Sequence, residues 1–292
     1  MRVLHLDSGN EMRGGQWQVL SLLKGLGAGN VLLTPAGGPL MAAAQACGLQ
    51  AEPLTMLSLG TMARQFDLVH AHDARSHTWA ATLSGVPLVV SRRVGFPVQK
   101  TFLSRWKYGR ASRYLAVSEH VKRTLVEAEI PEDKISVVYD GVDCPSNLAS
   151  GQRVIAPSSL DPMKGADLAR EAARLARVDL QFSDDLPADL PSAALLVYIT
   201  RSEGLGSAAL LAMAHGVPVV ASRVGGLPEI VSNCENGVLT ENEPVAIAAA
   251  IRRALVLRER LSANARRCIE EQFSAKNMIE KTMEVYGRVF PS

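Results

Sequence analysis

Short apolar runs alternate with helical stretches along the whole chain, and this alternation restricts the possible folds more than any other feature of the sequence. The runs are continuously apolar, as at residues 68–71 (LVHA) and 87–90 (PLVV). A strand with two apolar faces is typical of a parallel sheet that helices cover on both sides. The alternation therefore predicts an α/β chain built on doubly wound sheets.

The pattern begins at the N-terminus and starts again near the middle of the chain. In the first half we predict strands at Arg2–Asp7, Asn30–Thr34, Asp67–Ala71, Pro87–Ser91, Arg113–Val117 and Ile135–Val138. The helices predicted between them span residues 16–27, 38–48, 74–84, 98–110 and 119–129. In the second half we predict strands at Val154–Ala156, Val178–Phe182, Ala194–Thr200, Val217–Ser222 and Val238–Thr240. The helices there are predicted at 164–176, 207–215, 226–232, 243–256, 257–272 and 275–288.

A polar segment rich in Gly, Ser and Pro, residues 143–152, separates the two halves and is typical of a linker. We therefore expect two doubly wound domains that join near residue 148, the first spanning 1–148 and the second 149–272. Ligands of such sheets bind at the carboxyl ends of the strands, so we expect a site in the cleft between the domains.

Composition excludes several classes of protein. Of the 292 residues, 47% are hydrophobic and 21% are charged, as in ordinary globular proteins. The net charge of +2 is too small to indicate a nucleic-acid partner. The four cysteines form no C-x-x-C pair, so we expect reduced thiols in the cytoplasm, without zinc or disulfides. The sequence contains no run of about 18 apolar residues that would span a membrane, and we expect no signal peptide because its first residues form no long apolar stretch.

The turn at residues 202–206 (SEGLG) is the strongest candidate for a binding site. It follows a predicted apolar strand and precedes a helix of small residues that starts at Ser207. Free backbone N–H groups at a helix start bind anions, and glycines let a phosphate approach the backbone. A carboxylate repels phosphate, so we expect Glu203 to bind ligand hydroxyls. The alternative is that Glu203 only caps backbone N–H groups of the turn.

Two further segments contain residues that could contact a bound phosphate. Gly14 and Gly15 lie between the first strand and the first helix, where either a phosphate loop or a simple tight turn fits. Lys164 is expected to begin a helix, where the helix dipole disfavours a cation unless an anion is bound nearby. A solvated lysine is the alternative.

Polar residues near two strand ends of the first half are candidates for acceptor or cleft contacts. His70 and His72 share one face of a strand and precede Asp73, so they either point into the cleft or are buried and hydrogen-bonded. A metal site would need a third ligand, for which Asp73 is the nearest candidate, and we expect no metal. Arg92 and Arg93 follow the next strand.

The segment 92–123 is basic and contains interleaved aromatic residues, with Glu119 as its single acid. Such a segment either contacts anionic lipid headgroups or an anionic acceptor, or forms the solvated face of an amphipathic helix. We therefore expect peripheral contact with an anionic membrane through this segment.

The second half resembles the retaining glycosyltransferases of family four, which have the GT-B fold. The resemblance is carried by the runs at 202–206 (SEGLG), 212–222 (AMAHGVPVVAS), 225–231 (GGLPEIV) and 236–239 (NGVL), in this order and spacing. Weaker matches in the first half bring the resemblance to nearly the whole chain. It implies two Rossmann-like domains, the first for the acceptor and the second for the sugar donor. It also implies that residues 273–292 form a closing helix that returns to the first domain.

The resemblance implies a role for each matching residue. Glu203 matches the first glutamate of the E-x7-E motif, which contacts the donor sugar. Lys164 matches the lysine of the R-L-x-x-x-K-G motif, which neutralises the diphosphate leaving group. Gly14 and Gly15 match the loop of the first domain near the phosphates. The backbone facing the sugar and the diphosphate is matched by Gly204, Leu205 and Gly206, followed by Ser207.

Three departures from the family pattern fall in this predicted donor site. Leu211 stands where the second glutamate of E-x7-E, which holds the ribose, is expected. Ser159 stands where the family has the arginine that partners the lysine. The stretch between Lys164 and Glu203 is also too short for one of the usual strand–helix units.

The resemblance implies transfer of a sugar from a UDP-, GDP- or ADP-linked donor, with retention and without a cofactor or metal. The acceptor is expected to be a saccharide or a lipid-linked molecule of the cell envelope, at the inner face of the membrane. A non-catalytic GT-B scaffold is the main alternative, favoured by Leu211 and Ser159. A sugar-nucleotide epimerase of the same fold, with the histidine pair as acid and base, is a further alternative.

Overall fold

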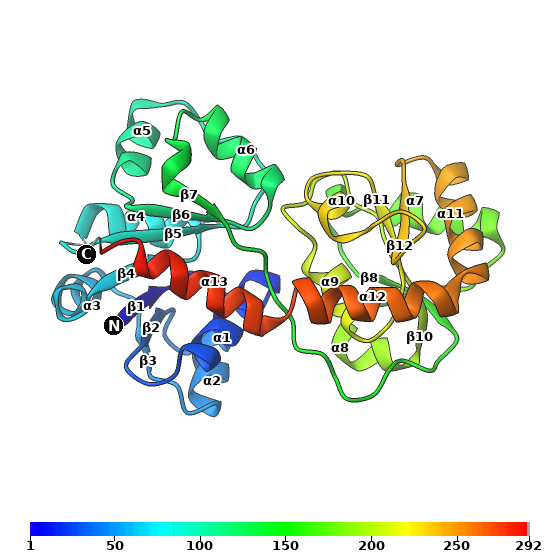
Figure 1. Cartoon of the computed structure of the whole chain (residues 1–292), viewed down its shortest axis with the longest axis horizontal. Helices are drawn as coiled ribbons and strands as arrows, with labels where there is room; N and C mark the ends of the chain where they lie inside the picture. Colours follow the sequence, from blue (N-terminus) through cyan, green and yellow to red (C-terminus); the bar gives the residue numbers. More distant parts are fainter. Residues whose placement is uncertain (84, 291–292) are drawn as a thin grey trace. The chain divides into compact units, whose positions relative to one another are not determined.

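The computed structural model describes residues 1–83 and 85–290. The chain divides into two compact units, one made of residues 1–140 and the segment from Ala275 onward, the other of Gly141–Ser274. Figure 1 shows that each unit is a sheet with helices packed around it. The predicted fold class, two doubly wound α/β domains, is confirmed.

Within the described residues, the sheet of the first unit has seven parallel strands in the order β3-β2-β1-β4-β5-β6-β7. The strands are β1 Val3–Leu6, β2 Val31–Thr34, β3 Ala51–Pro53, β4 Leu68–Ala71, β5 Leu88–Arg92, β6 Arg113–Ala116 and β7 Ile135–Val137. The helices are α1 Gly14–Leu26, α2 Pro39–Ala46, α3 Met56–Met62, α4 Ala74–Leu83, α5 Phe102–Gly109, α6 Glu119–Glu127 and α13 Ala275–Gly287. The strand order reverses between β1 and β4, and ligands of doubly wound sheets bind at such a point.

The second unit, over the same described part of the chain, has five parallel strands in the order β12-β11-β10-β8-β9. The strands are β8 Arg153–Pro157, β9 Leu180–Ser183, β10 Ala193–Tyr198, β11 Val219–Ser222 and β12 Gly237–Thr240. The helices are α7 Ala166–Ala176, α8 Leu186–Asp189, α9 Ser207–Ala214, α10 Leu227–Ile230, α11 Pro244–Val256 and α12 Arg258–Gln272. Here the order reverses between β10 and β8, which places the loops after these two strands side by side.

Two short elements of the first unit were not predicted. β3 pairs with β2 at the edge of the sheet, and its sequence AEP has no apolar run that would reveal it. α3 is capped by Thr55 and has one buried residue, Leu59, so it shows no helical stripe. The predicted helix 98–110 begins only at Phe102, because Thr101 caps it. Residue 84 of the predicted helix 74–84 and residues 291–292 of the predicted closing segment lie outside the described residues.

The N-terminal segment of the first unit ends at Asp140, eight positions before the predicted junction near residue 148. The predicted linker is held against the second unit by hydrogen bonds and does not run free. Just before the linker, the backbone N–H of Val142 donates to the Phe273 carbonyl at 3.0 Å, and within it that of Ala149 donates to the His215 carbonyl at 2.8 Å. Polar, glycine-rich composition indicated irregular structure correctly, but it carried no information about these backbone contacts.

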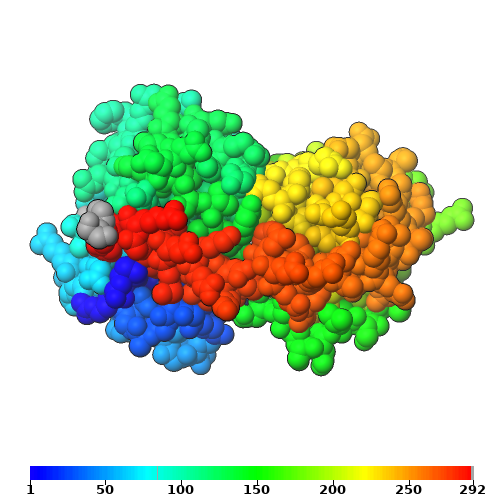
Figure 2. All heavy atoms as spheres, in the orientation of Figure 1, coloured from blue at the N-terminus to red at the C-terminus, as the bar shows by residue number. Residues whose placement is uncertain are grey.

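Helix α13 completes the core of the first unit. It packs beside α1 on one face of the sheet, and Figure 2 shows it along the surface of that unit. The shared core contains Val3, Leu22, Leu68, Val89, Leu115, Val138, Met278, Val285 and Tyr286. The Tyr286 hydroxyl lies 2.6 Å from His70 Nδ1, and the other nitrogen of His70 lies 2.8 Å from the Ser91 hydroxyl. A buried polar contact therefore joins the C-terminal helix to β4 and β5.

We expect Tyr286→Phe to lower the free energy of unfolding by about 1–3 kcal/mol, because it leaves a buried nitrogen of His70 without its hydroxyl partner. Urea unfolding followed by circular dichroism measures the change as a lower midpoint at unchanged slope. Met283→Leu, on the exposed face of the same helix, is the matched control. Equal midpoints for wild type and Tyr286→Phe would show that the contact contributes nothing.

Candidate active site

The carboxyl edge of the second sheet carries most of the residues predicted to bind the sugar donor. The loop after β8 contains Ser159 and Lys164, and the loop after β10 contains Glu203. Helix α9 starts directly after Gly206, whose φ of 121° is unfavourable for other residues. Among the described residues no side chain caps the first turn of α9, and that turn contains no acid. Its backbone N–H groups are therefore suited to an anion.

A buried network fixes the loop that carries Glu203. The Ser222 hydroxyl accepts a hydrogen bond from the Thr200 backbone N–H at 2.9 Å and donates to Asn242 Oδ1 at 2.6 Å. The Asn242 amide in turn donates to the Thr200 carbonyl at 3.0 Å. The last residue of β11 and a residue that follows β12 thus hold the backbone just after β10.

Gly225 and Gly226 support the same loop from the other side. A Cβ at Gly225 would overlap the Glu203 carbonyl oxygen, and one at Gly226 would overlap the Gly204 carbonyl oxygen. The backbone N–H of Gly226 donates to the Glu203 carbonyl at 3.3 Å. The glycine pair of the 225–231 run therefore allows two backbone segments to touch where a side chain would separate them.

The carboxylate of Glu203 is held by three hydrogen bonds. Its Oε2 accepts from the Tyr198 hydroxyl at 2.5 Å and from Lys164 Nζ at 3.1 Å, and its Oε1 accepts from the Gly204 backbone N–H at 3.1 Å. The Glu203 side chain is 17% exposed and that of Lys164 is 38% exposed. The structure thus brings together the two residues that the sequence predicted to be catalytic.

We expected Lys164 to begin a helix, and the structure shows that it does not. It ends a 3₁₀ turn over Pro162–Lys164, and α7 begins only after Gly165, which has a left-handed conformation. A Cβ at Gly165 would lie 2.8 Å from Ile199 Cγ2, so the turn sits tightly against the end of β10. This packing directs Lys164 toward Glu203, whose negative charge balances that of the lysine.

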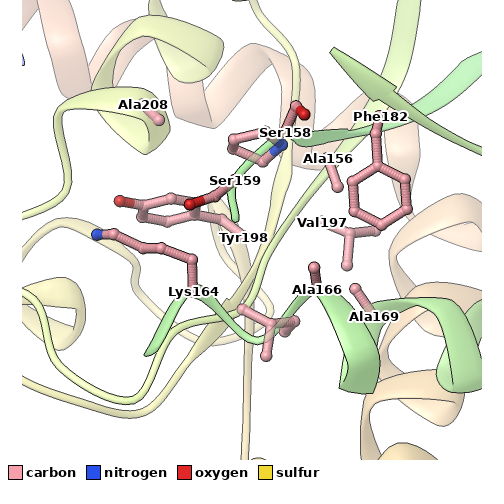
Figure 3. A pocket seen from close by; sticks show the side chains of 12 residues that line it. Ala156, Ser158, Ser159, Lys164, Ala166, Ala169, Phe182, Val197, Tyr198 and Ala208 are labelled. Carbon is pink, nitrogen blue, oxygen red and sulfur yellow. The ribbon is translucent and has the colours of Figure 1, made fainter. Parts of the chain in front are cut away.

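A pocket of about 170 Å³ opens beside this ion pair. Figure 3 shows the Lys164 amine and the Tyr198 hydroxyl at one end of it and the Phe182 ring at the other. The remaining lining residues are small or aliphatic: Ala156, Pro157, Ser158, Ser159, Ala166, Ala169, Val197, Ile199 and Ala208. The pocket therefore has a polar end suited to phosphate or hydroxyl groups and an apolar end.

The two residues that depart from the family pattern occupy different places. Ser159 lines the pocket, and its hydroxyl accepts a hydrogen bond from the Asp161 backbone N–H at 3.1 Å. Leu211 is half-buried one turn into α9 and is not part of the pocket lining. Neither residue brings a charge to the site.

A second polar group lies at the carboxyl edge of the first sheet. Arg93 Nε donates to Asp140 Oδ1 at 3.1 Å, and Arg93 Nη1 lies 3.4 Å from His72 Nδ1. Gly14 and Gly15 open α1 next to them, and a Cβ on Gly15 would lie 3.8 Å from Arg93 Cδ. The predicted contacts Gly15, His72 and Arg93 are therefore neighbours.

Two acidic residues at the same edge differ in their protonation behaviour. Burial alone would raise the pKa of Asp73, but hydrogen bonds from Ser8 and Ser76 outweigh it and lower the pKa. Burial and the Asp73 charge raise the pKa of Asp7, although Gly9 and Gln16 donate hydrogen bonds to it. Asp73 is thus held as a carboxylate that orders the loop after β1.

Arg92 does not join this group, which corrects its assignment to the cleft, whereas the ring centroid of His70 lies 3.9 Å from that of His72. Arg92 donates to the Tyr108 hydroxyl at 2.8 Å and to the Phe96 carbonyl at 2.5 Å, so it anchors α5. His70 is completely buried under α13, because its strand face is the one that the C-terminal helix covers. The alternative of a buried, hydrogen-bonded histidine holds for His70.

His5, His70 and His72 bring ring nitrogens within 4.8 Å of one another. Burial lowers the pKa of all three, that of His5 to about 3, so the rings are neutral at neutral pH. Both nitrogens of His70 face hydroxyl groups, and His5 Nδ1 lies 2.9 Å from His72 Nε2. Hydrogen bonds thus engage both nitrogens of His70 and Nδ1 of His5, whereas the buried Nε2 of His5 has no hydrogen-bond partner within the described residues.

The residues that sequence reasoning missed are Tyr198, Ser222 and Asn242. Ser222 lies inside the 212–222 run but has no charge or glycine to mark it. Asn242 lies beyond the runs that carry the resemblance. Tyr198 carries one signal, since it is the polar exception in an otherwise aliphatic strand, AALLVY.

Two family models match the chain. Residues 38–145 match the model described as Glycosyltransferase Family 4, and residues 151–256 match the one described as Glycosyl transferases group 1. The two matches fall on the first and second unit respectively and leave few residues between them.

Curated relatives and a solved structure agree with these models. D-inositol 3-phosphate glycosyltransferase of Geodermatophilus obscurus is 48% identical over 77 residues, 26% of this chain and 17% of that protein. The protein of the same name from a Nocardioides species is 29% identical over 81% of this chain and 54% of its own length. The chain thus spans about half of these relatives or less. Anabaena HepE, solved with UDP-glucose, has a TM-score of 0.87 at 18% identity, covering 99% of this chain and 100% of HepE.

The matches in both units and the two doubly wound sheets show that the chain belongs to the family 4 glycosyltransferases of the GT-B fold.

Proposed function

We propose that this chain transfers a sugar from a nucleoside-diphosphate sugar to an acceptor, with retention of the anomeric configuration. The observation that carries the proposal is the pair of Lys164 and Glu203, 3.1 Å apart at the reversal point of the second sheet and beside the uncapped start of α9. A cation and a helix start suit a diphosphate, and a carboxylate suits sugar hydroxyls.

The proposed chemistry is electrostatic. The bond between the anomeric carbon and the diphosphate oxygen breaks, and the acceptor oxygen bonds to the anomeric carbon on the face that the diphosphate leaves. The acceptor proton passes to the departing diphosphate. Lys164 and the N–H groups of α9 stabilise the charge that develops on this leaving group, and Glu203 fixes the sugar. The scheme requires no metal ion or other cofactor.

The donor is proposed to carry UDP, GDP or ADP. The structure of Anabaena HepE in complex with UDP-glucose makes UDP-glucose the first compound to test. The apolar end of the pocket around Phe182 has room for part of such a molecule beside the ion pair.

A non-catalytic scaffold is the second candidate, and Leu211 and Ser159 favour it because they bring no charge to the site. The epimerase alternative loses its support, since both histidines of the pair are buried, His70 beneath α13. Transferase and scaffold differ in one measurable respect, which is the release of nucleoside diphosphate.

We expect Lys164→Met and Glu203→Gln each to slow nucleoside diphosphate release about 30-fold to nearly 1000-fold, since each removes about 2–4 kcal/mol of transition-state stabilisation. The assay uses UDP-, GDP- and ADP-sugars with a mixture of saccharide and lipid-linked acceptors. Lys276→Met, at an exposed lysine of α13, is the control and should leave the rate unchanged. Nucleotide binding without release from any donor would establish the scaffold.

The acceptor is proposed to be lipid-linked, and α5 is proposed to contact an anionic membrane at the inner face of the cell. Phe102, Leu103 and Trp106 form one stripe of this helix and are 83%, 73% and 44% exposed. Lys100, Arg105 and Arg110 flank the stripe and are also exposed. An apolar stripe with a basic border suits the interface of an anionic bilayer. No helix within the described residues has the length and apolarity needed to cross a membrane.

We expect the protein to co-sediment with vesicles of phosphatidylglycerol and phosphatidylcholine, and to do so less at high salt, which screens lysine and arginine. Phe102→Ser/Leu103→Ser should reduce the bound fraction at least tenfold, because two exposed apolar side chains contribute about 1.5–3 kcal/mol each when buried. Leu57→Ser/Val256→Ser removes two other exposed apolar residues as a control. Equal sedimentation of both variants and the wild type would contradict the proposal.

A further inference from the structure

Tyr198 lies beneath the catalytic loop and contacts its carboxylate. It is the last residue of β10, nearly fully buried, and the five residues before it are Ala, Leu or Val. Its hydroxyl donates to Glu203 Oε2 at 2.5 Å, the shortest of the three bonds to this carboxylate. A strand residue thus reaches the group that is proposed to bind the sugar.

Tyr198 can only act here as a hydrogen-bond donor. Burial, followed by the charge of Glu203, raises the pKa of Tyr198 well above its usual value. The hydroxyl therefore keeps its proton throughout the physiological range. Its ring lies close to the backbone of Gly206, where an added Cβ would be 3.6 Å from Tyr198 Cε1.

The three hydrogen-bond donors to the Glu203 carboxylate differ in how firmly the surrounding structure holds them. Tyr198 and the Gly204 backbone N–H belong to a strand and to a loop held by the Thr200–Ser222–Asn242 network. Lys164 is the most exposed of the three, and its amine is at the end of a four-carbon stem. A diphosphate near Lys164 would compete with Glu203 for the same amine.

We propose that Tyr198 is a positioning residue that keeps the Glu203 carboxylate in its sugar-binding orientation while Lys164 exchanges Glu203 for the diphosphate of the donor. This inference rests on the proposed function. In this proposal Tyr198 acts through Glu203, to whose Oε2 its hydroxyl donates, and the Gly204 N–H holds the second carboxylate oxygen. The affinity for the nucleotide sugar should therefore depend on the Tyr198 hydroxyl, and the affinity for the nucleoside diphosphate should not.

The test compares the affinities of UDP and UDP-glucose by calorimetry, with the GDP and ADP pairs measured in parallel. Tyr198→Phe should weaken nucleotide-sugar binding about tenfold, the usual worth of a hydrogen bond to a charged group, and leave diphosphate binding unchanged. Unchanged diphosphate binding also shows that the variant is folded. Tyr114→Phe removes another buried hydroxyl, in the first unit, and should alter neither affinity.

A second pair of variants separates positioning from packing. Tyr198→Phe/Glu203→Gln should bind the nucleotide sugar no more weakly than Glu203→Gln alone, because Tyr198 acts through Glu203. Tyr198→Leu also removes the ring. A loss of diphosphate affinity in this variant, but not in Tyr198→Phe, would show that the ring supports the diphosphate site by packing, independently of the hydroxyl. Additive losses in the double variant would overturn the inference.

The outcomes distinguish this inference from the proposed function. If the wild-type chain binds no nucleotide sugar in the panel, the proposed function fails and the inference fails with it. If the wild type binds a nucleotide sugar and Tyr198→Phe binds both ligands as the wild type does, only the inference fails. A selective loss for the sugar-bearing ligand supports both.

Discussion

The site depends on one carboxylate oxygen, Oε2 of Glu203, which accepts hydrogen bonds from a buried tyrosine and from a lysine. A carboxylate this close to the start of an uncapped helix is useful only if its orientation is fixed. Otherwise it would turn toward the backbone N–H groups and occupy the position suited to an anion. Tyr198, the Gly204 N–H and the buried network around Thr200 prevent this, and the close packing of Gly225 and Gly226 holds the loop in place.

Both units place their polar side chains by the same rule. In the first unit His72 and Arg93 follow neighbouring strands β4 and β5, and in the second Lys164 and Glu203 follow β8 and β10. The second group lies where the strand order reverses, between β8 and β10, and the first lies next to the reversal between β1 and β4. Loops at such a point diverge to opposite faces of the sheet and leave the strand ends accessible. Parallel strands align these ends, so short loops suffice to bring distant parts of the chain within hydrogen-bonding distance.

The sequence allowed the fold class to be predicted, because apolar strands leave strong local patterns, and its glycine turns marked the segments of the candidate site. It did not reveal β3, whose edge position demands no apolar run, or the early end of the first unit, which depends on backbone contacts such as Val142 to Phe273. His70 was assigned to the cleft because strand periodicity shows which residues share a face, but not which helix covers that face. Tyr198 was missed for a similar reason, since its role lies in a contact with Glu203 across the loop.

The return of α13 to the first unit has a consequence for synthesis. The apolar face formed by Val3, Leu68 and Val89 is complete only when Met278 and Tyr286 cover it. On the ribosome, the first unit therefore emerges without part of its core, and it stays so while the whole second unit is translated. During that interval the second unit, which is continuous in sequence, is free to fold first. Completion of this core cluster of the first unit therefore has to wait for the translation of α13.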